Sequence, residues 1–104
     1  MAKYLLAYRG GGMPDSPEAT ANVMAAWGAW FGKLGAAVAD PGNPVSQAKT
    51  IAADGSVSGD GRSSLSGYSI ISAESLDAAI ALAKGCPVLS SGATIEVCET
   101  FEAM

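Results

Sequence analysis

The sequence predicts an α+β fold of the ferredoxin-like type, in which two helices cover one face of an antiparallel sheet. Three observations predict it: two segments carry a helical repeat of apolar residues, strand-like apolar segments flank both of them, and the elements follow the order β-α-β-β-α-β with a small extra hairpin strand. A length of 104 residues allows one domain, residues 1–104.

The first strand and the first helix have the clearest signals. Residues 3–9 are apolar with polar ends and stop at the glycines of 10–12, which predicts a strand that is buried on both faces. Asp15 or Ser16, followed by proline, forms a helix start, and the helix is predicted over 17–37. Its apolar stripe includes Val23, Trp27, Trp30, Phe31 and Leu34.

The middle of the chain is predicted to form a short hairpin. Two prolines shortly after residue 40 require the helix to end before them. Residues 45–52 then predict the second strand, and an Asp-Gly turn leads to a weaker return strand at 56–58. The small polar residues 59–66 predict a mobile loop.

The second half of the chain repeats the pattern of strand, helix and strand. Residues 67–72 predict a strand, a helix over 76–83 follows with Ser72 or Ser75 as its N-cap, and residues 93–101 predict the last strand. The face of that strand away from the helices carries Glu96, Cys98 and Thr100. We expect this bare sheet face either to be wet or to line a cavity that a second subunit closes.

Charge and composition exclude several partners and chemistries. Six basic and ten acidic residues give a net charge of −4, and the basic residues are spread singly, so we expect no nucleic acid partner. The chain lacks histidine, and Cys86 and Cys98 do not have metal-ligand spacing, so we expect no metal and no cofactor. Two reduced thiols are favoured over a disulfide between them. No signal-peptide core or membrane span is evident, and a cytoplasmic protein without a membrane partner is expected.

The apolar content of 49% overstates the size of the core. Twenty of the apolar residues are alanine, which removes little surface from water, and the thirteen glycines add none. The scaling law for folded monomers gives an exposed surface of about 5,400 Å² for a chain of this mass. Because so much of the core is small, we expect a homodimer in which a partner covers additional apolar surface.

Six short motifs follow one another along nearly the whole chain. They are Lys3-Tyr4-x-Leu6-x-Tyr8, Leu34-Gly35-Ala36, Gly42-x-Pro44, Gly67-Tyr68-x-Ile70-Ile71, Leu76-Asp77-x-Ala79 and Gly85-Cys86-Pro87. Their order resembles the YCII-related family, and more narrowly its branch named for a D-G-P-F motif. This resemblance implies a dimeric α+β barrel, in which two ferredoxin-like sheets pack face to face around clefts that can hold small ligands.

The resemblance also implies a catalytic pair of histidine and aspartate, and here the sequence departs from the family. The chain has no histidine, so the activity does not carry over, although Asp40 lies roughly where the family places its acidic residue. The position of the D-G-P-F motif reads Asp60-Gly61-Arg62-Ser63.

Four residues are the candidates for ligand binding, and no catalytic residue is assigned. The four are Tyr8, Arg9, Asp40 and Tyr68. Residues 10–12 are expected to be a flexible connector rather than a phosphate cradle, because their spacing matches no phosphate-binding motif. Trp27 and Phe31 are expected in the core, with the wall of a ligand pocket as the alternative, and Trp30 could belong to either.

Two functions follow from these candidates. The first is a small-molecule-binding or accessory module without established catalysis. The alternative is a cofactor-free isomerase, lyase or oxygenase that acts on a small organic acid in the dimer cleft, where Arg9 would hold a carboxylate and Asp40 or Tyr68 would move the proton. A protein-interaction module, with a different protein on the bare sheet face, is a third hypothesis.

Overall fold

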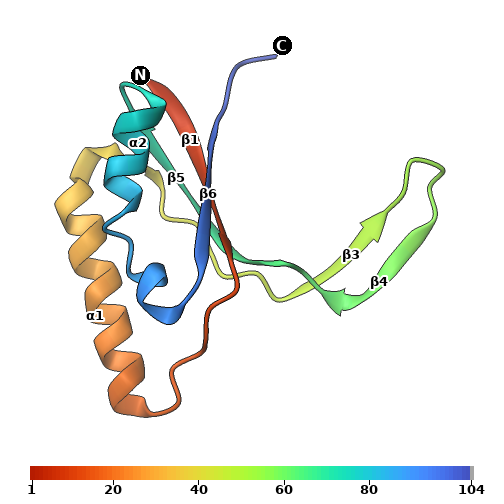
Figure 1. The fold of residues 1–104 in the computed structure, drawn as a ribbon, viewed down its shortest axis with the longest axis horizontal. Helices are drawn as coiled ribbons and strands as arrows, with labels where there is room; N and C mark the ends of the chain where they lie inside the picture. The colour runs from red at the N-terminus through yellow and green to blue at the C-terminus, as the bar shows by residue number, and fades with distance from the viewer. Residues whose placement is uncertain (104) are drawn as a thin grey trace.

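The computed structural model describes residues 1–103, and its fold is α+β and ferredoxin-like (Figure 1). The antiparallel main sheet has the strand order β2-β5-β1-β6, and these strands are β1 (Ala2–Arg9), β2 (Val38–Asp40), β5 (Leu65–Ala73) and β6 (Thr94–Glu99). The helices are α1 (Pro17–Leu34) and α2 (Leu76–Ala83), followed by the short 3-10 helices η1 (Gly35–Ala37) and η2 (Pro87–Ser91), respectively. The strands β3 (Gln47–Ile51) and β4 (Val57–Arg62) form a separate two-stranded sheet.

Both helices begin at serine N-caps. The Ser16 hydroxyl accepts a hydrogen bond from the backbone N–H of Ala19 at 3.0 Å, and Ser75 does the same for Ala78 at 3.1 Å. Of the two candidates for each N-cap, the structure therefore has Ser16 and not Asp15, and Ser75 and not Ser72. Both predicted helices are confirmed, and η1 extends α1 to the predicted end at residue 37.

The core lies between the helices and one face of the sheet. On that face the fully buried side chains of Tyr4, Leu6 and Ile71 pack against the helical layer. Trp30 is 5% exposed, and its indole N–H donates to the carbonyl of Leu82 at 3.2 Å, which ties α1 to α2. The remaining buried members of the core are Tyr8, Ala73, Ala79, Ala83 and Cys86.

The second strand of the sheet is not where the sequence placed it. Residues 38–40 form β2 directly after the helix and pair with β5, whereas 47–51 pair with β4 outside the main sheet. Three residues are too few to show an alternating pattern, so β2 has no periodic signal in the sequence.

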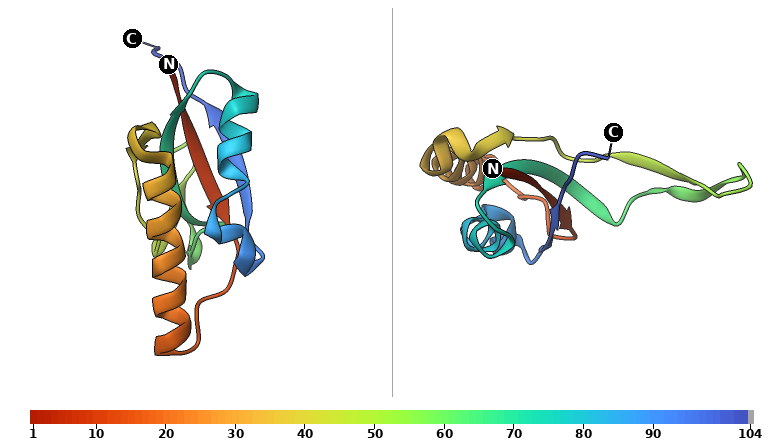
Figure 2. Two further views of the ribbon diagram at one scale, coloured as in Figure 1. Left: turned by 90° about the vertical axis from the view of Figure 1, so that its left-hand side faces the viewer. Right: turned by 90° about the horizontal axis from the view of Figure 1, so that it is seen from above.

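The prediction of a mobile loop over residues 59–66 is also wrong, because most of these residues form strands. Backbone pairing across the turn at Asp54 continues to Arg62, opposite Gln47, and β5 begins at Leu65. The Asp54 carboxylate accepts hydrogen bonds from the Ser56 N–H and hydroxyl, which lower its pKa. Small polar residues can form this ladder because its hydrogen bonds come from the backbone. We call the hairpin of residues 47–62 the arm; it extends away from the helices (Figures 1 and 2).

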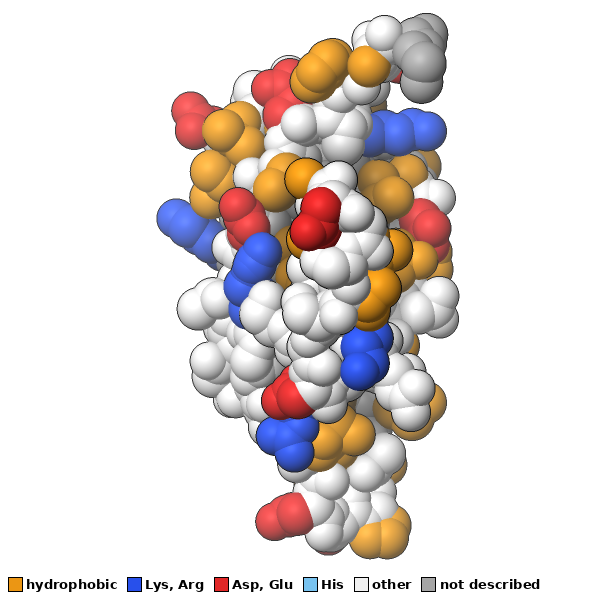
Figure 3. Space-filling model, turned by 90° about the vertical axis from the view of Figure 1, so that its right-hand side faces the viewer, with side chains coloured by type: hydrophobic (Ala, Val, Ile, Leu, Met, Phe, Trp, Pro, Cys, Tyr) orange, Lys and Arg blue, Asp and Glu red, His pale blue; other side chains and the backbone are white. Residues whose placement is uncertain are grey.

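The sheet face opposite the helices, here called the open face, has a partly apolar centre. Leu5 is flanked across the strands by Ile70 and Cys98, and all three side chains are partly exposed. The first strand is therefore well buried on its helix face and only partly on the other, which corrects the prediction of burial on both faces. Seen from the side of the arm, acidic and basic side chains are interspersed with apolar ones (Figure 3).

Both cysteines are free thiols, Cys86 in the core and Cys98 on the open face. Among the described residues, no helix is both long enough and apolar enough to span a membrane.

Candidate functional site

A cavity of about 770 Å³ lies on the helical side of the sheet. One side of α1 forms one wall, and the segments after β1 and β2, the start of β5 and η2 form the others. Apolar side chains dominate the lining, including Met13, Val23 and Met24, which are 91%, 40% and 70% exposed. Such a volume is in the range of pockets for small organic molecules.

Three aromatic rings form the inner wall of this cavity. The ring centroids of Tyr8 and Trp27 are 5.6 Å apart at an interplanar angle of 63°, and those of Trp27 and Phe31 are 5.6 Å apart at 37°. Trp27 and Phe31 are half-buried, with one part against the core and another on the cavity. Trp27 and Phe31 therefore act both as core residues and as the wall of a pocket, whereas Trp30 belongs to the core.

Two hydroxyl groups among the lining residues are linked by a hydrogen bond. The Tyr8 hydroxyl donates to the Ser69 hydroxyl at 2.7 Å, and Ser69 donates to the carbonyl oxygen of Pro41, also at 2.7 Å. Burial raises the pKa of Tyr8 well above its usual value, so its hydroxyl stays protonated in alkaline solution as well as at neutral pH. Since its proton goes to Ser69, the phenolic oxygen keeps acceptor capacity, and the Cys86 thiol also lies within its reach.

Ser66 is another polar residue in the lining of the cavity. Its hydroxyl oxygen is buried and has no hydrogen-bond partner among residues 1–103. A buried hydroxyl without a partner costs about 1–3 kcal/mol, and a bound hydroxyl, carbonyl or water would remove that cost.

Glycines shape the rim of the cavity. Gly42 has φ +78°, and a Cβ there would collide with the carbonyl oxygen of Tyr68. Only glycine therefore allows the segment after β2 to approach β5 so closely. The glycines at 10–12 also border the cavity, and the Gly12 N–H donates to the carbonyl of Ser91 at 3.3 Å.

The structure divides the four predicted ligand-binding residues between two faces. Tyr8 lines the cavity on the helical side, and Tyr68 borders it where its backbone meets Gly42. Strand alternation directs the Tyr68 side chain to the open face, in register with Ala7. Asp40 is half-buried and pairs with Ile70.

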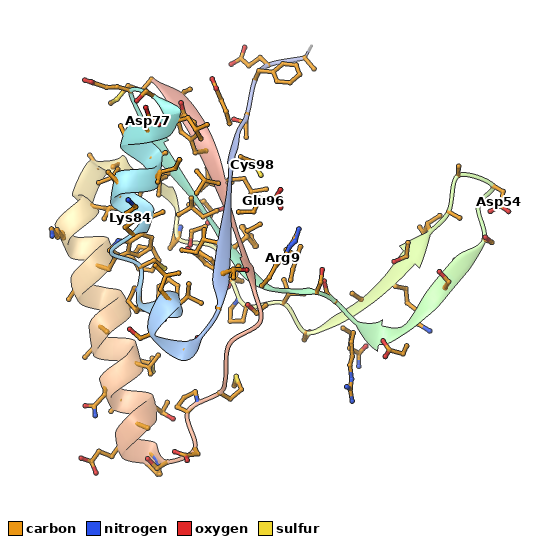
Figure 4. The ribbon with its side chains drawn as sticks, in the orientation of Figure 1. Arg9, Asp54, Asp77, Lys84, Glu96 and Cys98 are labelled. Carbon is orange, nitrogen blue, oxygen red and sulfur yellow. The ribbon has the colours of Figure 1, made fainter. Side chains whose placement is uncertain are left out.

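The two charged candidates already have partners within the chain. The Arg9 guanidinium forms a salt bridge with the Glu96 carboxylate at 3.0 Å, on the side of the sheet from which the arm extends (Figure 4). The Asp40 carboxylate accepts a hydrogen bond from the Gly42 N–H at 2.8 Å and so holds the cavity rim in place. Tyr8 and Arg9 therefore do not belong to one site within a single chain.

Sequence reasoning missed Ser66 and Ser69. Ser69 had a usable signal, because a hydroxyl in the middle of a buried apolar strand needs a partner, and here that partner is Tyr8. Ser66 had none, since it lay in the segment predicted to be a loop.

The chemistry available to these groups is limited. Burial raises the pKa of the Cys86 thiol, which disfavours the thiolate that a nucleophile needs. The described residues contain no cluster of three histidine, cysteine, aspartate or glutamate side chains that could hold a metal ion. What the cavity offers is an aromatic surface with hydroxyl-bearing residues in its lining.

Comparison with known proteins identifies the fold only. No family model and no curated protein matches the chain. A solved structure, that of 5-chloro-2-hydroxyhydroquinone dehydrochlorinase from Burkholderia phenoliruptrix in complex with 2,5-dihydroxybenzoquinone, is similar with a TM-score of 0.56 and 24% identity. The similarity covers 96% of this chain and 93% of that one, so the two share their fold over essentially their whole length.

Proposed function

We propose that this protein binds a small, flat, largely apolar organic molecule that carries hydroxyl or carbonyl groups. One observation carries the proposal: an apolar cavity of about 770 Å³ has aromatic rings among its lining residues, and that lining also includes Tyr8 and Ser66, whose hydroxyl groups are able to pair with a ligand. Aromatic rings bind flat molecules by stacking, and the few polar groups fix their orientation.

The dehydrochlorinase supplies a reasonable first probe. Its structure contains 2,5-dihydroxybenzoquinone, a flat ring with hydroxyl and carbonyl groups, and the two proteins share a fold. This supports a YCII-related assignment and the choice of ligand class, both of which are part of the proposal.

Isothermal titration calorimetry with 2,5-dihydroxybenzoquinone tests the cavity. Val23→Glu places a charge in the apolar lining, and we expect it to weaken binding at least about tenfold. Ala25→Glu adds the same charge on the same helix at an exposed position that is not among the cavity lining, so its affinity should match that of the wild type. Equal binding by Val23→Glu and wild type, or no binding at about 1 mM, would overturn the proposal.

We further propose that a second copy of the chain covers the open face. The partly exposed apolar centre formed by Leu5, Ile70 and Cys98 supports this, as does the alanine-rich composition. Arg9 and Glu96 form a salt bridge at one side of this centre. Because the two charges are paired, removing them from water under a second subunit costs less free energy.

This second copy is the basis of an alternative function, a cofactor-free isomerase, lyase or oxygenase. Arg9 and the Tyr68 side chain share the open face, so stacking two sheets would enclose both in the cleft between them. In that case Arg9→Ala and Asp40→Asn abolish turnover of a small organic acid while Val23→Glu does not. Turnover that survives Arg9→Ala and Asp40→Asn removes this assignment.

A further inference from the structure

The most unusual feature of the molecule is the arm, which contacts little besides itself. Its two strands pair with each other, and no other helix or strand makes more than marginal contact with them. An isolated two-stranded hairpin is at best marginally stable in water. The arm therefore needs a surface to dock on.

The exposed area of the chain gives the size of the missing contact. The chain exposes 7121 Å², whereas a folded monomer of this mass exposes about 5,400 Å². The excess of about 1,700 Å² is roughly twice the 800 Å² that each partner contributes to a standard interface. The radius of gyration, 15.2 Å against about 13 Å for a compact chain of this length, shows the same expansion. The area suits a permanent interface between subunits.

The residues of the arm indicate what kind of partner covers it. Its charges balance, with Lys49 and Arg62 against Asp54 and Asp60, so it has no electrostatic attraction for nucleic acid or an anionic membrane. Near its tip two apolar side chains lie directly opposite each other and are exposed, Ile51 at 73% and Val57 at 62%. Directly opposed residues of a hairpin share one face, so these two form an apolar contact point.

The length and direction of the arm favour a second copy of this chain. The arm extends on the side of the sheet opposite the helices, which is the side of the open face (Figures 1 and 4). Each of its legs has about seven residues and so spans roughly 23 Å, whereas stacked sheets are about 10 Å apart. An arm on one subunit thus reaches past the sheet of a subunit stacked on the open face.

We propose that the arm of each subunit docks through its Ile51 and Val57 face on a second copy of the chain and holds the dimer together. This inference rests on the proposed second copy at the open face and assigns the arm a role in it. By two-fold symmetry both arms make the same contact, which doubles the area that they bury.

Analytical ultracentrifugation of the full chain tests the docking. The double variant Ile51→Asp/Val57→Asp should raise the dissociation constant of the dimer at least about tenfold. The control Thr50→Asp/Ser58→Asp places the same two charges on the adjacent opposed pair, which faces the other side of the arm, and should dimerise like the wild type. Circular dichroism checks that all variants remain folded.

Hydrogen exchange provides a second readout that needs no variant. The amides on the outer edges of β3 and β4 should be protected at protein concentrations where the dimer forms and exchange rapidly on dilution. Exchange that does not depend on concentration would overturn the docking, as would equal association of the two double variants.

These experiments distinguish a failure of the docking of the arm from a failure of the proposals on which that docking rests. A Leu5→Glu variant that dissociates the dimer, together with an Ile51→Asp/Val57→Asp variant that does not, overturns the docking and leaves the second copy in place. A wild-type chain that is monomeric at about 1 mM overturns both and assigns the arm to some other partner. The calorimetric test of the cavity is independent of either result.

Discussion

Gly42 shows how a single residue determines the geometry of the cavity. Its backbone is in the left-handed region, and the space where a Cβ would stand is occupied by the carbonyl of Tyr68. Gly10 has nearly the same φ, +76°, but open space around it. A substitution at Gly10 therefore adds only backbone strain, whereas one at Gly42 adds backbone strain and steric overlap.

We expect Gly10→Ala to lower the free energy of unfolding by about 1 kcal/mol, the strain of a left-handed alanine. Gly42→Ala should lower it by about 3 kcal/mol or more, because overlap with β5 adds to the same strain. Urea denaturation of both variants measures the difference. Equal losses would mean that the segment after β2 moves aside without cost.

Tyr8 gives the protein a stability that depends on pH. Its pKa is raised chiefly by burial, and the hydrogen bond from its hydroxyl to Ser69 only partly opposes this. In the unfolded chain the phenol ionises near its usual pKa of about 10, while in the folded chain it stays protonated to higher pH. Stability should therefore be constant below pH 10, as far as Tyr8 is concerned, and should fall above it.

Tyr8→Phe should make the fall in unfolding free energy above about pH 10 shallower, by up to about 1.4 kcal/mol per pH unit. A decline that starts near pH 8.5 should remain, because burial also raises the pKa of Cys86. Urea denaturation between pH 7 and 11 gives both slopes. Identical slopes above pH 10 in the wild type and Tyr8→Phe would contradict the assignment.

At the residue scale, the sequence indicated some members of the site but not how they are grouped. Tyr8 and Tyr68 were chosen by residue type and position on a strand, and both border the cavity. Alternation along a strand places neighbours on opposite faces, so Tyr8 and Arg9 could not share a site in one chain. The pairing of Arg9 with Glu96 joins β1 to β6 across 87 positions, and no local pattern reveals it.

At the element scale, the helices were predictable because their signals are local. The capping serines, the proline at the start of α1 and the apolar repeat all lie within a few turns of one another. β2 was not, because its three residues carry no periodic signal. The hairpin of the arm was predicted around its Asp-Gly turn, but its full length was not, because β4 is built from small polar residues held by backbone pairing. Ser72 and Ser75 were equivalent as N-caps in the sequence, and only the structure distinguishes them.

Ser75→Ala should lower the free energy of unfolding by about 1 kcal/mol, because it removes the hydrogen bond to the Ala78 N–H at the start of an eight-residue helix. Ser72→Ala removes no cap and should change it by less than about 0.5 kcal/mol. Urea denaturation measures both. A larger loss for Ser72→Ala would show that the helix begins one turn earlier than the structure has it.

At the scale of the whole molecule, the composition predicted a partner but could not locate it. Abundant alanine indicated a small core, whereas the structure adds a hairpin that pairs chiefly with itself and is held away from the body. The direction of the arm depends on the short connection between β4 and β5, two residues long, which makes the arm a continuation of a central strand. No pattern in the sequence distinguishes such an arm from a hairpin folded back on the sheet.

The two free cysteines report on the proposed dimer without any mutation. Cys98 is partly exposed at the centre of the open face, beside Leu5, whereas Cys86 is 3% exposed within the core. We expect iodoacetamide to modify Cys98 quickly in dilute protein and progressively more slowly as the concentration rises, because a second copy covers the open face. Cys86 should stay unmodified at every concentration until the chain unfolds, and so it is the internal control. Peptide mass spectrometry quantifies both sites.

The same labelling connects the open face to the arm. If docking of the arm holds the dimer together, Ile51→Asp/Val57→Asp should keep Cys98 reactive at concentrations where the wild type protects it. Thr50→Asp/Ser58→Asp, with charges on the other side of the arm, should protect Cys98 like the wild type. Because neither pair of substitutions lies on the open face, a difference in Cys98 reactivity between them can arise only through association of the chains. Labelling of Cys98 at one constant rate in all three proteins would show that the open face remains free and that the excess surface serves some other contact.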